Sequence, residues 1–462
     1  NKAKAYTLQG DYYYQEKRYA DAIKSFRKAA ELGEKAFMEF ELEELKNRWI
    51  MALIQHGKYK DAEKVLGEIR ETDTPTRTIT GLKDALCSRA CIAIMKKDYA
   101  TAEALRKEAG RRYHESMNSM DFYRLNVLRN FFDSFTLVAR CYERQNEIGQ
   151  SLQTYREMKE YLINTLGLYI PYYIDLDRTN MLNLFQPWYD EMQTFAYRHI
   201  SHGGMAEFMY SNAQLMKQFF LVSPTIYNPK MISMQGDEYL RELSRRQSKL
   251  MLTEDAMNVH LKGDYLPHIL SNMRSMALIR EAVTYVLENV DKPYQCITEW
   301  ESVRKIIAAD AEVMVEFVLL HRPDNGARQY AALVFTEVDK APHFVPLCDE
   351  EPLRTALNDT DHDRRNDFIL KNIWKPIQAH FGERAVISLY PTGLLSTVPL
   401  AGIVDDNNAY LCNDYVLSFY LCATDRLMKK YHLYPEKKPA VLFGAADYGL
   451  PPSKLKNPVR GQ

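Results

Sequence analysis

The stretch "VISLYPTGLLSTVPLAGI" (residues 386–403) decides the fold class of the last third of the chain. Its first four residues, 386–389, are strand formers, and the run stops at Pro391-Thr392-Gly393, a combination that favours a tight turn. A short apolar segment follows and ends at Pro399. We therefore expect a central strand with a turn at its carboxyl end, the edge where open α/β sheets keep their binding sites.

The sequence around this stretch alternates between strand and helix patterns. "VMVEFVLL" (313–320) and "RQYAALVFTEV" (328–338) predict two strands separated by a turn. An amphipathic helix, "RRNDFILKNIWKPIQAHF" (364–381), precedes the strand at 386–389, and "AVLFGAADYG" (440–449) predicts a further strand. Strands that alternate with helices predict an α/β layer with a largely parallel sheet.

A different pattern fills the first third of the chain. In "GDYYYQEKRYADAIKSFRKA" (10–29), small and aromatic residues recur at the intervals of a tetratricopeptide (TPR) helix–turn–helix unit. These residues are Gly10, Tyr13, Tyr19, Ala22, Phe26 and Ala29. The Tyr-x-x-Ala step returns at Tyr59 and at Tyr99, a period of 40 residues, and a weaker unit spans 139–158. Because one unit cannot bury its own apolar face, the repeats predict a solenoid whose concave side binds an extended partner. The alternative is an array that only positions the following domain.

Prolines and changes of period divide the chain into segments. Pro171 ends the repeat pattern, and Pro224 and Pro229 make a second break in a region that stays helical. The predicted segments are TPR repeats in 1–165, a helical spacer in 166–295, an α/β part in 296–436 and one further strand in 437–462. The expected fold class is thus an α-solenoid and helical spacer followed by an α/β domain.

Composition and charge limit the possible partners. The chain of 462 residues has 60 Lys plus Arg against 61 Asp plus Glu, so it carries no large net field that would attract nucleic acid or anionic lipid. Its seven cysteines are scattered and odd in number, unlike a secreted disulfide framework. No apolar run approaches the roughly 20 residues that span a bilayer. These features predict a cytoplasmic protein that binds protein or peptide, without contact to nucleic acid or membrane.

Six segments resemble the CHAT domain, the caspase-like domain found attached to TPR arrays and related to separase. They are "TEWESVRKIIAADAEVMVEFV", "YAALVFTEV", "FILKNIWKPI", "VISLYPTGLLSTVPLAGI", "YLCNDYVLSFYLCATDRL" and "AVLFGAADYG". The most specific block is the strand, the Pro-x-Gly turn and the apolar segment that ends at Pro399. The resemblance implies a caspase-like α/β domain that is incomplete in this chain. Residues 296–436 would form a pseudo-protease-like part, and 437–462 the first strand of the protease core.

The resemblance also implies where the chemistry lies. Caspase-like peptidases use a His and a Cys that follow the strand which "AVLFGAADYG" resembles, so we expect both C-terminal to Gln462 and no catalytic residue in this chain. It further implies that Asp447 and Tyr448 line the pocket for the substrate side chain next to the scissile bond. Asp447 would favour a basic side chain there, and a turn-capping aspartate is the alternative. No cofactor, nucleotide or metal is expected.

Two polar motifs imitate functional ones. His202-Gly203 resembles the His-Gly pair of the family, but it precedes the α/β part, so we expect a structural or loop role. "DTDHDRR" (359–365) resembles a hard-metal cluster but lacks the Gly and the distal acid of a calcium loop. We expect a solvated loop and a helix start.

Four cysteines could likewise be taken for metal ligands or nucleophiles. Cys87 and Cys91 lie about one helical turn apart but no further metal ligand is near in sequence, so we expect core cysteines. Cys412 and Cys422 flank a β-rich segment, and we expect both in the core rather than as nucleophiles.

Three function classes remain open at this point. We favour a TPR-regulated cysteine endopeptidase, in which the repeats sense a protein partner and control proteolysis of a protein substrate. The second class is a non-catalytic TPR scaffold with a degenerate protease-like domain. The third is a peptide-binding repeat protein whose α/β end is a dimerisation or docking module.

Overall fold

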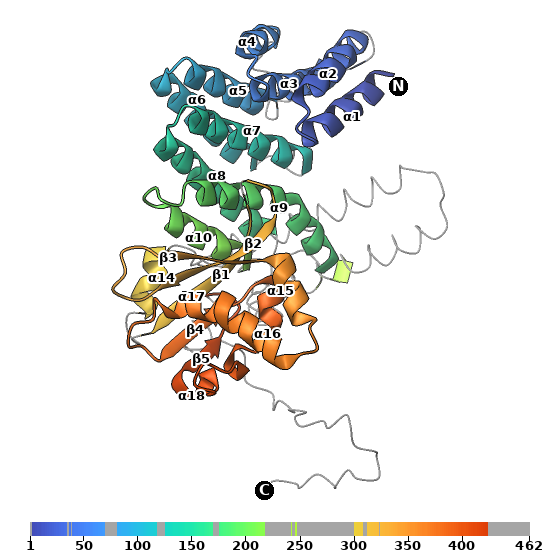
Figure 1. Cartoon of the computed structure of the whole chain (residues 1–462). Helices are drawn as coiled ribbons and strands as arrows, with labels where there is room; N and C mark the ends of the chain where they lie inside the picture. Colours follow the sequence, from blue (N-terminus) through green and yellow to red (C-terminus); the bar gives the residue numbers. More distant parts are fainter. Residues whose placement is uncertain are drawn as a thin grey trace.

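The structure is a computed structural model that describes residues 2–34, 37, 39–69, 81–117, 125–169, 175–217, 242, 245–246, 300–307, 312–322 and 324–423. Within these residues, stacked helices are followed by a mixed five-stranded sheet with covering helices (Figure 1). The predicted order of a helical part and then an α/β part is therefore confirmed. The strand predicted at 440–449, including Asp447 and Tyr448, lies outside the described residues, as does most of the predicted spacer after residue 217.

The first part of the described chain consists of four helical hairpins. They are α1 (Lys2–Gln15) with α2 (Tyr19–Gly33), α3 (Glu39–Gln55) with α4 (Tyr59–Gly67), α5 (Gly81–Met95) with α6 (Tyr99–Met117), and α7 (Leu125–Arg144) with α8 (Ile148–Tyr169). In Figure 1 they form a stack that leads from the N-terminus towards the sheet.

All four hairpins are closed by the same turn. A residue with positive φ ends the first helix in each, namely Lys17, Gly57, Lys97 and Asn146. The N–H of the next residue donates to a carbonyl five residues back, with distances from 2.8 Å for Arg18 to Tyr13 to 3.0 Å for Glu147 to Tyr142. This is the closure of a Schellman motif, which satisfies the last carbonyls of a helix. The same turn therefore reverses the direction of the chain in the same way in each hairpin.

Small residues let the first two helices approach closely. Ala22 and Ala29 are fully buried in α2, and Phe26 is 1% exposed. A Cβ on Gly10 would lie 2.5 Å from the Phe26 ring, so only glycine fits at this crossing. The seam of small residues against an aromatic ring, predicted from the spacing, is confirmed for these four positions.

One hydrophobic core runs from the hairpins into the sheet. The first helices of successive hairpins contact each other in the order α1, α3, α5 and α7, and α7 then contacts α9 (Asp175–Arg198). The core continues through α10 (Met205–Lys217) and α14 (Trp300–Ile307) to buried side chains of the sheet such as Met314 and Leu333. The helical part and the sheet therefore share buried contacts.

The sheet has the strand order β3-β2-β1-β4-β5. Its strands are β1 (Val313–His321), β2 (Arg328–Phe335), β3 (His343–Asp349), β4 (Val386–Tyr390) and β5 (Val416–Phe419). β1 pairs with β2, and β2 with β3, in antiparallel register; β4 pairs in parallel with both β1 and β5. β4 is thus an inner strand, as the sequence predicts.

The prediction of a largely parallel sheet is wrong, because two of the four pairings are antiparallel. The link from β1 to β2 is too short for a parallel crossover. It is closed by the N–H of Arg322, which donates to the carbonyl of Ala327 at 2.8 Å. β3 was not predicted from the sequence. It contains Pro346, which an edge strand tolerates because one side of its backbone needs no partner.

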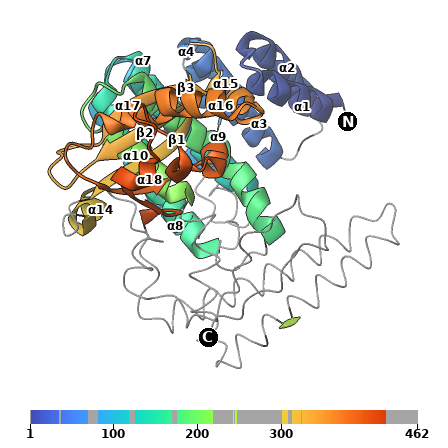
Figure 2. The ribbon, with the colours of Figure 1, turned by 60° about the horizontal axis from the view of Figure 1, so that its bottom comes forward.

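Helices cover both faces of the sheet. Alternate residues of β1 divide between two cores: Val313, Val315 and Phe317 belong to one, and Met314 and Val318 to the other. The first core is closed by α15 (Glu350–Leu357), α16 (His362–Ile369), a π-helical turn (Leu370–Trp374) and α17 (Lys375–Gln378). The second is closed by α9, α10 and α14. Figure 2 shows the sheet and these helices from a second direction.

The polar motifs have the roles expected from the sequence. His202 and Gly203 lie in the exposed turn between α9 and α10. The carboxylate of Asp361 caps α16 by accepting from the N–H of Asp363 at 3.0 Å and of Arg364 at 3.2 Å. Both motifs are loop or capping elements.

The expectation for the cysteines is correct in three cases. Cys87, Cys91 and Cys422 are buried, with 1%, 0% and 0% exposure. Cys412 is exposed, so its predicted core position is wrong. It lies in the short helix α18 (Leu411–Asp414), and the neighbouring Leu411 is the residue that faces the core.

Candidate functional site at the helix–sheet junction

Helix α9 joins the hairpins to the sheet, because it contacts both α7 and β1. On one side of the helix, Trp188 and Phe195 are buried in the helical core. On the other side, the hydroxyl of Tyr197 donates to the side-chain oxygen of Gln329 at 2.7 Å, and its ring packs on Phe344 at 5.4 Å between centroids. A displacement of α9 would therefore move both parts of the protein.

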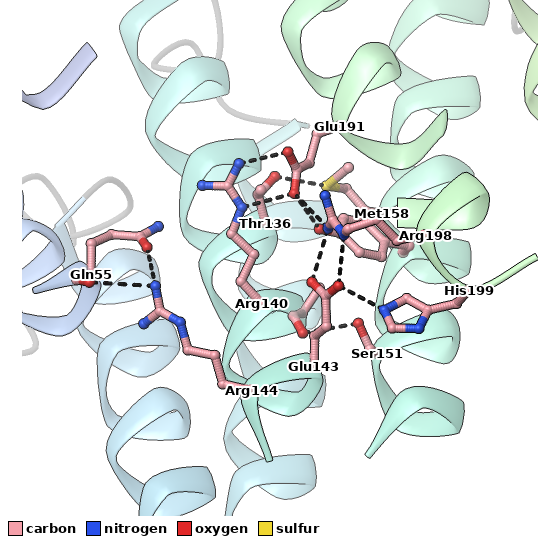
Figure 3. A network of polar contacts seen from close by, with 12 residues as sticks. Gln55, Thr136, Arg140, Glu143, Arg144, Ser151, Met158, Glu191, Arg198 and His199 are labelled. Atoms are coloured by element: carbon pink, nitrogen blue, oxygen red, sulfur yellow. Dashed lines mark hydrogen bonds and ion pairs between the residues drawn. The ribbon is translucent and has the colours of Figure 1, made fainter. Parts of the chain in front are cut away.

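A charge ladder made of Arg140, Glu143, Glu191, Arg198 and His199 fixes α9 on α7 (Figure 3). Arg140 of α7 donates twice to Glu191 of α9, at 2.8 and 2.6 Å. Arg198 of α9 donates twice to Glu143 of α7, at 2.9 and 3.0 Å. Each helix thus supplies one arginine and one glutamate. Two forked pairs of opposite polarity fix the register as well as the distance between the helices.

Further contacts lie within and beside this ladder. Tyr155 of α8 donates to Glu191 at 3.1 Å, and His199 contacts Glu143 at 2.7 Å. Burial opposes ionisation of Glu191, but the hydrogen bonds and charge of Arg140 prevail and lower the pKa of this carboxyl to about 2. Arg144, one turn further along α7, donates to the side-chain oxygen of Gln55 at 2.6 Å (Figure 3). The polar contacts therefore run from α3 to α9.

A second polar cluster lies between α10 and the sheet. Glu316 of β1 is fully buried, and its carboxylate pairs with the ammonium group of Lys217 at 2.5 Å. Gln214 donates to the same carboxylate at 2.6 Å and accepts from the N–H of Ala423 at 2.8 Å. Lys217 also donates to the carbonyl of Tyr390 at the end of β4, at 2.7 Å. The cluster ties α10, β1, β4 and the segment after β5 together.

Burial controls the titration of this cluster. Loss of water around the carboxyl raises the pKa of Glu316 to about 7, although Lys217 and Gln214 act in the opposite direction. A buried charge that loses its partner is costly, because no water replaces the lost contact. Lys217 is therefore required wherever Glu316 is ionised.

A cleft of about 520 Å³ opens beside this cluster. It lies between α9, α10, the second half of β1 and the turn after β4. Its polar lining residues include Asp190, Lys217, His321, Arg328 and Thr392. A volume of this size is in the range of ligand-binding pockets, roughly 300–1,000 Å³. The cleft is at the carboxyl ends of two neighbouring parallel strands, β1 and β4, the edge that the sequence predicted for a site.

The turn at Pro391-Thr392-Gly393 shapes one wall of the cleft. Gly393 has a φ of +53°, and a Cβ there would lie 2.6 Å from the hydroxyl oxygen of Tyr330. That oxygen accepts from the N–H of Leu394 at 2.8 Å. Both contacts require glycine, because a side chain would be strained in this conformation and would displace Tyr330. The sequence therefore predicted the turn, and the structure adds the partner that fixes it.

The candidate site residues foreseen from the sequence stay a prediction. Asp447 and Tyr448 lie outside the described residues. The sequence reading missed Asp190, Lys217 and Glu316, although a glutamate inside the apolar run "VMVEFVLL" was a visible signal. A charge in the middle of a buried strand needs a partner.

No protein-family model and no curated protein sequence matches the chain. Among the described residues, no group of three or more His, Cys, Asp or Glu side chains is arranged to hold a metal ion. None of the helices in the described part is both long and apolar enough to cross a bilayer.

Proposed function

We propose that this chain is the regulatory N-terminal portion of a TPR-regulated, caspase-like (CHAT) cysteine endopeptidase. The helical hairpins bind a protein partner, and that event controls proteolysis of a protein substrate. The sequence supports this proposal through the repeat intervals and the six CHAT-like segments. The observation that carries it is the position of α9, which is locked onto α7 by the charge ladder and packed on β1 at the same time.

The stack of hairpins is suited to bind an extended partner. The contacts of α1 with α3, α3 with α5 and α5 with α7 run without interruption, so neighbouring hairpins are coupled along the whole array. In repeat arrays of this kind, each unit contacts its neighbours and the inner helices present a continuous surface. A partner that changes the curvature of the stack changes the position of α7, and the ladder passes this change to α9.

The edge of the sheet is the part of the protein that responds to a change in the position of α9. α9 and α10 supply Asp190 and Lys217 to the cleft at the carboxyl end of β1 and β4. In a complete peptidase, the His and Cys would come from residues after Gln462, as the resemblance implies. This chain would then contribute control, not the reacting groups.

The test uses the complete protein, with the residues encoded after Gln462, and a peptidyl chloromethyl ketone that alkylates a catalytic cysteine. We expect labelling of a cysteine after Gln462 that increases when an extract of the source cells is added, and no labelling of residues 1–462 alone. The variant Arg140→Glu should uncouple labelling from the extract, and the exchanged pair Arg140→Glu/Glu191→Arg should restore it. Labelling of residues 1–462 alone would overturn the assignment of the chemistry.

The alternative is a non-catalytic TPR scaffold with a degenerate protease-like domain. It predicts that the complete protein retains partners from the extract but that no cysteine reacts with the probe under any condition. Cys412 is exposed, so Cys412→Ser is the control for non-specific alkylation and should leave the labelling unchanged.

A further inference from the structure

The second half of β1 has an open edge. β4 is the neighbour of β1 on this side, but its last paired residue, Tyr390, stands opposite Glu316. β1 continues to His321, and from Phe317 onward no described strand pairs with it on this side. On the other side, pairing with β2 continues to His321 opposite Arg328. Within the described residues, the end of β1 therefore has an open edge on the side of β4.

The register shows which backbone groups face this edge. Arg322 donates its N–H to Ala327, so its backbone groups point towards the β2 side. Successive residues of a strand alternate between its two sides, so Leu320 and Val318 also point towards β2. Leu319 and His321 then direct their N–H and C=O groups to the open side. Both residues line the cleft.

The turn after β4 keeps this edge accessible. The main chain leaves the sheet at Pro391-Thr392-Gly393, and Gly393 is held against Tyr330 and Leu319, with its Cβ position 3.7 Å from the Leu319 side chain. The following segment is buried in the core on the α15–α17 face, where Leu395 and Leu400 pack. The described segment after this turn therefore does not continue along β1, and the cleft of about 520 Å³ lies beside the open edge.

One carboxylate of the cleft lacks a cationic partner among the described residues. Asp190 accepts from the side-chain amide of Gln186 at 2.8 Å, and it forms no ion pair with a described Lys, Arg or His. The two cations of the cleft have other partners: Lys217 pairs with Glu316, and Arg328 with Glu350 at 3.2 Å. Burial raises the pKa of Asp190, and the hydrogen bond from Gln186 and the charges of His321 and Arg328 offset this only in part.

We propose that an extended peptide with a lysine or arginine side chain binds in this cleft as an added strand. Its backbone pairs with the open edge of β1 at Leu319 and His321, and its basic side chain reaches Asp190. The stem of that side chain packs on Ala213 and Met216, which line the same cleft. Strand addition supplies affinity through main-chain hydrogen bonds, and a side-chain pocket supplies selectivity. The cleft binds such a peptide whether or not the complete protein is a peptidase.

The binding test uses two pools of fluorescein-labelled heptapeptides. Both pools vary among Val, Thr, Tyr and Ser at six positions, and the central residue is Lys in one pool and Glu in the other. Fluorescence anisotropy with residues 1–462 should show roughly tenfold or greater preference for the Lys pool, as one hydrogen-bonded charge pair provides. Asp190→Asn should reduce this preference to about threefold or less, and Asp190→Arg should reverse it. The matched control is Asp367→Asn, because Asp367 of α16 forms an exposed ion pair with Lys371. This variant should keep the preference for the Lys pool.

The backbone part of the proposal is tested separately, without any protein variant. Hydrogen exchange should show protection of the amides of Leu319 and His321 when the Lys pool is added. Peptides that carry N-methyl groups at alternate residues should lose binding in one of the two registers and keep it in the other. Equal binding of the two pools, a Lys preference that survives in Asp190→Asn, or unprotected β1 amides would each overturn the proposal.

Discussion

The buried carboxyl of Glu316 should make the stability of the protein depend on pH in a way that a single substitution removes. Its pKa in the folded protein is raised by burial to about 7, against an ordinary value of 4.5. A carboxyl with a raised pKa favours the folded state at low pH. This contribution is complete below the unfolded pKa of 4.5 and is lost as the pH rises through the folded pKa of about 7.

The size of the effect follows from the same two values. One unit of pKa difference corresponds to about 1.4 kcal/mol, so the full contribution of Glu316 is about 3 kcal/mol. Between about pH 5 and about pH 8, the free energy of unfolding should fall by about 2–3 kcal/mol through this group alone. Other carboxyls act in the opposite direction, such as Glu191, whose pKa is lowered to about 2. The comparison must therefore be made between proteins that differ only at residue 316.

The assay is urea unfolding of the wild type and Glu316→Gln at several pH values in this range. Gln keeps the shape of the side chain but cannot ionise. The free energy of unfolding of the wild type minus that of Glu316→Gln should therefore decline steadily as the pH rises. Glu351→Gln, at a side chain that is 80% exposed, is the control and should give a difference that stays near zero. If the wild type and Glu316→Gln lose or gain stability in parallel from pH 5 to 8, the proton linkage assigned to Glu316 is wrong.

Three further sets of substitutions test the packing and the ladder. Arg140→Met and Glu191→Met should each cost about 1–3 kcal/mol, with a coupling energy of about 1 kcal/mol or more in a double-mutant cycle; additive costs would mean that the pair is not an energetic unit. Gly393→Ala should cost about 1–3 kcal/mol in thermal unfolding, and less when Tyr330→Phe removes the opposing oxygen; an unchanged melting temperature would contradict the close contact. Ala22→Phe should cost about 1–3 kcal/mol by overpacking the fully buried seam between α1 and α2, and a neutral effect would show that the seam can expand.

Most of the secondary structure elements could be predicted because the patterns that mark them lie within a short stretch of sequence. The alternation of small and aromatic residues around Phe26 reflects how two adjacent helices touch, so it is visible in a window of twenty residues. The apolar run of β1 is visible for the same reason. The direction of the strands was not visible, because it depends on the length of the link between β1 and β2 and on where β4 enters the sheet. β3 was missed because Pro346 argues against a strand unless the strand is known to be at an edge.

The candidate site was less accessible from the sequence, because its members come from distant segments. Lys217 reaches the carbonyl of Tyr390, which is 173 residues further along the chain, and Gln214 reaches Glu316 over 102 residues. No local pattern marks the lysine at the end of α10 as the partner of a buried glutamate. The glutamate itself was recognisable, since a strand buried on both faces rarely holds an unpaired charge.

The two polar clusters differ in a way that indicates where the protein can move. The cluster of Lys217 and Glu316 is almost fully buried, with 8% and 0% exposure of the two side chains, so separating the pair would leave a charge without water. The ladder between α7 and α9 is partly open to solvent, with 28% exposure for Arg140 and 14% for Glu191. When its pairs separate, water can replace the lost contacts at a lower cost. We therefore expect α10 to move with the sheet as one body, and the ladder, not the buried cluster, to rearrange when a partner on the hairpins displaces α7 and, through it, α9. Substitutions in the ladder should then alter the response to a partner while the sheet stays folded, whereas loss of Lys217 should unfold the junction itself.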